Sequence, residues 1–149
     1  MVSKVLKARR RILNSLEKLC WLPPLLARIS IGSIFIVSGW GKLHNIEKVI
    51  GFFTDLGIPL PELQAHFVAW TELIGGSLIL VGLLTRIASV PLIIMMTVAI
   101  LTAKKSDIHG ITDLLSLDEF IYIIFFIWFV ITGAGKASVD AIFSRRKNS

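Results

Sequence analysis

Cysteine is almost absent from this sequence, and its scarcity removes several kinds of chemistry. The 149 residues contain one cysteine, Cys20. A single thiol forms neither an intramolecular disulfide nor a CxxC relay within one subunit. The sequence also lacks a haem-binding pattern and a nucleotide-binding glycine loop, so it supplies no electron carrier of its own. We therefore expect that the chain is not a stand-alone redox enzyme, and that any electron comes through a bound quinone or a partner.

Acidic residues are also scarce relative to basic ones. Against 16 lysines and arginines stand 10 aspartates and glutamates, which gives a formal charge of +6. Such a charge is compatible with nucleic acid, but the basic residues cluster at the two termini, beside apolar segments. Basic residues in that position are typical of contact with anionic lipid headgroups. We expect the lipid bilayer as a partner and no nucleic acid.

Apolar residues dominate the rest of the chain. They make up 54% of it, and the mean hydropathy is +0.77. A membrane-spanning helix needs about 20 mostly apolar residues. We predict an all-α integral membrane four-helix bundle, within residues 22–141, between a basic amphipathic segment (1–21) and a basic tail (142–149). The predicted spans are residues 22–40, 64–84, 87–103 and 117–134.

Orientation follows from the lysines and arginines beside the spans, because cytoplasmic segments retain positive charge. One side carries the basic residues before the first span, Arg86 between the second and third spans, and the basic residues after the fourth. The opposite side has fewer basic residues: Lys42, Lys48, Lys104 and Lys105. We predict a multi-pass protein of the inner (cytoplasmic) membrane with both termini in the cytoplasm.

A short amphipathic helix is predicted between the first two spans. Asn45 is a good N-cap residue, and Ile46, Val49 and Phe53 follow it at helical spacing. The topology places this helix on the periplasmic surface.

Two ionisable residues lie inside the predicted spans, where a charge is costly and usually faces the bundle interior. Glu72 is near the middle of the second span, and Arg28 is near the cytoplasmic end of the first. Both share a helix face with small residues, which mark the faces on which membrane helices approach one another. A rise of about 1.5 Å per residue puts Glu72 level with Ser33 and about 7 Å from the level of Arg28. A guanidinium can close that gap, so Arg28 and Glu72 are the candidate charge pair, with Lys42 as a weaker partner for Glu72.

The candidate pair has two interpretations. In the first, Glu72 belongs to a buried pair that fixes helix register, or is a protonated carboxyl hydrogen-bonded to Ser33 or Ser38. In the second, Glu72 and Arg28 form a catalytic site that handles a proton. The sequence leaves both interpretations open.

Aromatic side chains are the second feature of the predicted interior. Tyr122 and Phe126 share a face of the fourth span, and Phe35 lies on the inward face of the first. An apolar pocket with a few polar groups suits a hydrophobic ring such as a quinone, although aromatics at helical spacing also form ordinary cores. The candidate cofactor-binding residues are Phe35, Lys42, Glu72, Tyr122 and Phe126.

The three histidines all fall on the predicted periplasmic side. They are His44, His66 and His109, and their spacing matches no metal-binding motif. One interpretation is three unrelated interface residues. The alternative is that the three converge on one metal ion, together with Glu119 or Asp55.

Three motifs resemble the DoxX family of four-helix membrane proteins. The first is Arg28-x3-Gly32-x2-Phe35-x3-Gly39-x2-Lys42-Leu43. The second is Glu72-x2-Gly75-Gly76-x5-Gly82-x2-Thr85-Arg86. The third is Gly133-Ala134-Gly135-Lys136-Ala137-Ser138-Val139-Asp140, which is similar to a closing G-x-G-x-x-S-x-D segment. The resemblance covers residues 25–141.

The resemblance implies a membrane subunit associated with oxidoreductase complexes, since the family's founding examples are linked to quinone-coupled oxidation of sulfur compounds. We therefore expect a subunit with a pocket for a quinone-like or other hydrophobic ligand, working with other membrane or soluble redox subunits or with further copies of itself. The alternative is a non-catalytic anchor or assembly subunit that recruits a soluble partner. A small-molecule permease is disfavoured, because four unbroken spans make a transport path hard to build in a monomer.

Overall fold

The computed structural model describes residues 17–105 and 108–146, and over these residues all regular structure is helical. The predicted all-α class is confirmed. The amphipathic helix predicted for residues 1–21 lies largely outside the described residues. The helices are α2 (Leu22–His44), α3 (Ile46–Asp55), α4 (Pro61–Val81), α5 (Thr85–Thr102), α6 (Ile111–Ser116), α7 (Asp118–Thr132) and α8 (Val139–Arg146).

Three of the four predicted spans are helices long and apolar enough to cross a membrane. They are α2, α4 and α5, with 23, 21 and 18 residues. The fourth predicted span is the 15-residue α7, which begins after Leu117 and ends before Gly133, where the backbone turns to a φ of +77°. At about 1.5 Å per residue, α7 extends about 22 Å, less than the roughly 30 Å thickness of the hydrocarbon core. Residues 17–105 and 108–146 therefore contain three candidate spans and a shorter apolar helix.

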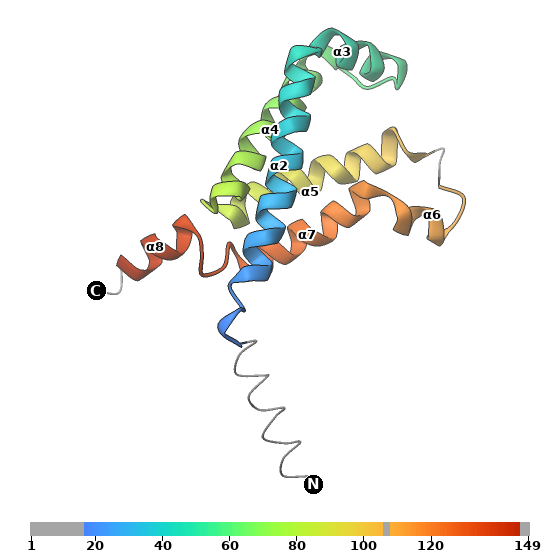
Figure 1. Cartoon of the computed structure of the whole chain (residues 1–149). Helices are drawn as coiled ribbons and strands as arrows, with labels where there is room; N and C mark the ends of the chain where they lie inside the picture. The colour runs from blue at the N-terminus through green and yellow to red at the C-terminus, as the bar shows by residue number, and fades with distance from the viewer. Residues whose placement is uncertain (1–16, 106–107, 147–149) are drawn as a thin grey trace.

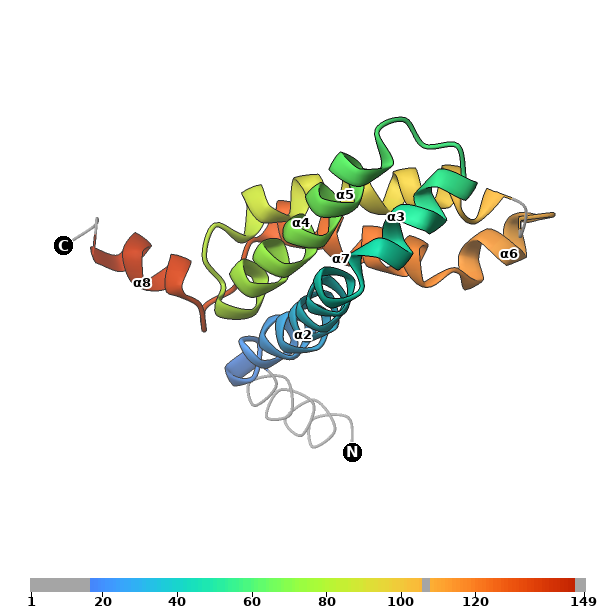
Figure 2. The same ribbon diagram turned by 90° about the horizontal axis from the view of Figure 1, so that it is seen from above.

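These helices form two antiparallel pairs, α2 with α4 and α5 with α7. The pairs are joined by the short turn between α4 and α5, and Gly75 of α4 packs against Leu92 of α5. Figure 1 shows the pairs close together near α8 and the start of α2, and diverging toward α3 and α6. Seen from above, α3 continues from the end of α2 and reaches over the space between the pairs (Figure 2).

Glycines allow α2 and α4 to approach closely. A Cβ added to Gly39 of α2 would lie 2.6 Å from the backbone nitrogen of Leu73, and one added to Gly76 of α4 would lie 2.9 Å from the carbonyl oxygen of Gly32. Direct backbone contact over small residues is the usual way in which membrane helices pack. These contacts also fix the register of the pair.

Burial of polar and apolar residues follows the pattern of a protein surrounded by lipid. Arg28, Glu72, Thr85 and Ser89 are buried. Large apolar side chains cover the outer surface of the long helices, among them Val37, Ile74, Ile87, Leu101 and Ile131. A surface of this kind is stable against acyl chains and would be unfavourable in water.

Arg28 connects the two helix pairs at the end where they meet. Its Nε donates to the carbonyl oxygen of Ile79 (3.1 Å) and its Nη2 to that of Leu80 (3.2 Å), both at the end of α4. Its Nη1 donates to the carbonyl oxygens of Ala134 (2.6 Å) and Ala137 (2.9 Å), in the segment after α7. One guanidinium thus satisfies carbonyls from both pairs, a use that requires its fork of donors.

The turn between α4 and α5 is shaped around this guanidinium. Gly82 has a φ of +76°, and a Cβ there would lie 2.7 Å from Cζ of Arg28. The N–H groups of Leu84 and Thr85 donate to the carboxylate of Asp140 (2.9 and 3.3 Å), while the N–H of Asp140 donates to the carbonyl oxygen of Gly82 (3.0 Å). A residue far along the chain therefore caps the start of α5.

Two neighbouring glycines of α2 give a matched test of this packing. Gly39→Ala places a Cβ against the backbone of α4, and we expect it to destabilise the protein by about 1–3 kcal/mol. Gly41→Ala places a Cβ in open space, so it should leave the free energy of unfolding unchanged or raise it by up to about 1 kcal/mol, because alanine has the higher helix propensity. Reversible unfolding in mixed detergent micelles measures both. Equal effects of the two substitutions would contradict the described packing.

Candidate functional site

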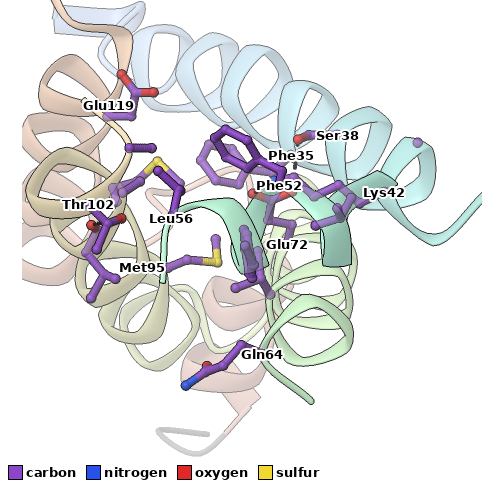
Figure 3. A pocket seen from close by; sticks show the side chains of 18 of the residues that line it. Phe35, Ser38, Lys42, Phe52, Leu56, Gln64, Glu72, Met95, Thr102 and Glu119 are labelled. Atoms are coloured by element: carbon purple, nitrogen blue, oxygen red, sulfur yellow. Dashed lines mark hydrogen bonds and ion pairs between the residues drawn. The ribbon is translucent and has the colours of Figure 1, made fainter. Parts of the chain in front are cut away.

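A cavity of about 780 Å³ occupies the space where the two helix pairs diverge. This volume lies within the range of roughly 300–1,000 Å³ that is usual for small-molecule sites. Residues of α2, α3, α4, α5 and α7 line it, so every helix around the opening contributes to the wall. In Figure 3, Ser38, Lys42 and Glu72 of α2 and α4 lie on one side of the cavity, and Thr102 and Glu119 lie on the other. Leu56 and Met95 lie between them.

The polar group consists of Glu72, Lys42 and Ser38. Glu72 is 2% exposed, and its Oε1 forms an ion pair with Nζ of Lys42. Its other oxygen, Oε2, accepts a hydrogen bond from Oγ of Ser38 at 2.9 Å. Both carboxylate oxygens therefore have partners, as a buried charge requires. The side chain of Lys42 is 30% exposed, and its ammonium has N–H groups beyond the one directed at Glu72.

The predicted pairing of Arg28 with Glu72 is wrong, and helix register is the reason. Gly32 packs against Gly76, so Glu72 lies further along α2 than the level of Ser33. Lys42, the weaker candidate, is the actual partner, and Ser38 is the hydroxyl that bonds to Glu72. Arg28 lies instead beside the end of α4, bonded to backbone carbonyls.

Aromatic rings of α2 and α7 close the inner end of the cavity. The ring of Phe35 meets that of Tyr122 at 5.3 Å and that of Phe126 at 5.1 Å between centroids, both edge to face. Phe35 and Tyr122 line the cavity together with Lys42 and Glu72. Phe126 is fully buried in the core cluster and does not line it. Four of the five candidate ligand-binding residues thus share one cavity, and the fifth supports the ring of Phe35.

Several lining residues were not predicted from the sequence. They come from α3, whose position over the opening has no local sequence signal, and from the inner faces of α4 and α5. Among them are Phe52, Leu56, Gln64, Met95 and Thr102. The spacing of apolar residues predicted the apolar face of α3, but it did not predict that α3 covers the cavity.

The histidines do not form a metal site. In the ranges 17–105 and 108–146, no three His, Cys, Asp or Glu side chains come close enough to hold a metal ion. His44, His66 and His109 are all exposed. Nδ1 of His44 lies 3.0 Å from the carbonyl oxygen of Trp40, one turn earlier on α2.

Comparison with known proteins finds a family model and several relatives. Residues 24–105 match the family model described as DoxX. The chain is 34% identical over 126 residues to a Bacillus subtilis protein named "Putative oxidoreductase CatD", covering 83% of this chain and 90% of that protein. It is 32% identical over 136 residues to "Uncharacterized membrane protein Rv3486" of Mycobacterium tuberculosis, covering 80% of each.

A third relative is "Inner membrane protein YqjF" of Escherichia coli, 27% identical over 125 residues, which cover 82% of this chain and 92% of that protein. No solved structure matches the chain significantly. Together with the candidate spans, these likenesses identify a multi-pass membrane protein whose relatives include inner membrane proteins.

A double-mutant cycle tests which cation pairs with Glu72. Lys42→Met leaves a buried carboxylate without its counter-charge, so we expect it to destabilise the protein more in the wild-type background than in Glu72→Gln. The coupling energy should be about 1 kcal/mol or more. The matched cycle of Arg28→Lys with Glu72→Gln should be additive within about 0.5 kcal/mol, because Arg28 and Glu72 share no partner. Coupling in the second cycle and additivity in the first would contradict the described pairing.

Proposed function

This chain belongs to the DoxX family, and from that premise we propose that it is a membrane subunit of an oxidoreductase system that binds a quinone-type molecule between its helix pairs. The name of the Bacillus subtilis relative supports an oxidoreductase role. The name of the Escherichia coli relative supports a place in the inner membrane.

The composition of the cavity is the observation that carries the proposal. Its wall is largely apolar, with the polar group Lys42–Glu72–Ser38 on one side, in which Glu72 is buried, and with Tyr122, Thr102 and Glu119 elsewhere on the wall. A quinone has the matching chemistry, a flat apolar ring with carbonyl oxygens that accept hydrogen bonds. Sites of this class are usually apolar with a few placed polar groups.

Each residue of the polar group has a defined task in this proposal. The ammonium of Lys42, held by Glu72, would donate a hydrogen bond to a ring carbonyl. The carboxylate of Glu72, held by the hydroxyl of Ser38, would take up or release a proton. Phe35 would pack against the ring. A quinone, when bound, supplies two-electron and two-proton chemistry.

The membrane topology that goes with this function has four spans and cytoplasmic termini. Most basic residues of the sequence belong to the end where the pairs meet: those before α2, Arg86 and those after α7. At this end Nη2 of Arg86 donates to the carbonyl oxygen of Ile131. Lys42, Lys48, Lys104 and Lys105 belong to the opposite end, which holds the cavity. By the positive-inside rule, the end with α8 is cytoplasmic and the cavity is periplasmic. α7 completes the crossing beside α5, with which it is paired.

Quinone titration of the purified protein in nanodiscs, followed by tryptophan fluorescence, tests the proposal. We expect a saturable change in the wild type and about tenfold weaker binding in Glu72→Gln, because the substitution removes the charge that positions Lys42. Glu62→Gln, at the exposed start of the same helix, is the matched control and should bind as the wild type does. A wild type without saturable binding would rule the proposal out, and so would equal affinities in the two variants.

A further inference from the structure

The cavity reaches the outer surface of the protein on the flank of α2. Val37 and Ile34 both line it, yet Val37 is 71% exposed and Ile34 is 45% exposed. A side chain that borders a cavity and is also largely exposed marks a place where the cavity wall ends. Val98 of α5 also lines the cavity while being 48% exposed.

This opening on α2 lies toward α7, because the opposite flank of α2 is occupied. Gly32 and Gly39 are pressed against α4, whereas Phe35 directs its ring at Tyr122 of α7. α2 and α7 belong to different pairs, which diverge beyond this ring contact toward α3. The resulting gap has Ile34 and Val37 along one edge.

The depth and chemistry of the gap match the hydrocarbon region. Val37 is 15 positions after the first residue of α2, or about 22 Å along a helix that crosses a core roughly 30 Å thick. Both edge residues are β-branched and apolar. Two charged lining residues lie further along the chain than Val37, Lys42 near the end of α2 and Lys48 on α3. Phe52 of α3 and Leu56, which directly follows α3, line the cavity at that end.

We propose that the gap between α2 and α7, edged by Ile34 and Val37, is a lateral portal from the bilayer into the cavity. The ligand class that follows is a membrane-dissolved molecule with a polar head ring and a long apolar tail. The head ring lies at Lys42 and Glu72, and the tail leaves through the portal into lipid. The head ring's identity as a quinone depends on the function proposed above, whereas the portal does not.

Thiol modification in vesicles tests the portal without any quinone. A single cysteine is placed on the far cavity wall with Met95→Cys in a Cys20→Ser background. One reagent is pyrene maleimide, which dissolves in the bilayer, and the other is a charged methanethiosulfonate, which stays in water. Val37→Trp should slow the first reaction at least about fivefold by filling the portal, and should leave the second unchanged. Val90→Trp, on the outer face of α5 and outside the cavity lining, is the matched control and should alter neither rate.

Binding of matched ligands tests the tail. A benzoquinone ring bearing a decyl tail should bind about tenfold more tightly than the same ring without it, beyond their difference in bilayer partitioning, because part of the tail contacts the portal. Val37→Trp should remove this preference and leave binding of the tail-less ring unchanged.

The outcomes separate the two proposals. If Val37→Trp slows neither reagent, or slows both equally, the portal is disproved. If the thiol rates change as expected but neither quinone binds to the wild type, the portal stands and the quinone proposal fails. Equal binding of the two quinones would overturn the assignment of a tailed ligand.

Discussion

Arg28 ties together parts of the chain that are more than a hundred residues apart in sequence. Its guanidinium donates hydrogen bonds to four backbone carbonyl oxygens, two at the end of α4 and two after α7. In a bilayer such carbonyls have no water to bond with, so leaving them without donors would be costly. The glycine at position 82 and the cap that Asp140 supplies to α5 are both arranged around this contact. The ends of the two helix pairs are therefore fixed on one side of the molecule.

The cavity is a consequence of fixing the pairs at one end only. α2 and α4 stay in contact along their length because glycines let their backbones touch. α5 and α7 form the second pair, which diverges from the first toward α3 and α6. The opened end is lined by side chains rather than filled by them, and α3 covers it. The contacts of one guanidinium at the end where the pairs meet thus determine at which end the cavity opens.

The sequence left open whether the buried charge of Glu72 is structural or functional. The ion pair of Lys42 with Glu72 answers the structural part of this question. It is structural in that each partner neutralises the other and joins α2 to α4. It also faces the cavity, which a purely structural pair has no need to do. We therefore infer that the ion pair both joins α2 to α4 and provides the polar group for a ligand. The second role is part of the function proposed above.

Much of this arrangement could be predicted from the sequence, and the exceptions share one cause. Apolar runs and small-residue faces identified the long helices and the inward positions of Arg28, Glu72 and Phe35, since these depend on local spacing alone. The pairing of Glu72 depends on the register between α2 and α4. That register is set by the close backbone contacts of α4 with Gly32 and Gly39. The ends of α7 depend on Gly133 and the motif that follows it, and the contribution of α3 depends on its direction after Asn45. None of these is a property of one segment.

Photolabelling with an azidoquinone in native membranes, followed by peptide mapping, tests the central claim most directly. The account predicts labels on the α2 peptide containing Ser38 and Lys42 and on the α7 peptide containing Tyr122, both suppressed by an excess of unlabelled quinone. Labels spread over the lipid-facing side chains of α4, such as Phe67 and Trp70, and unaffected by competition, would contradict it.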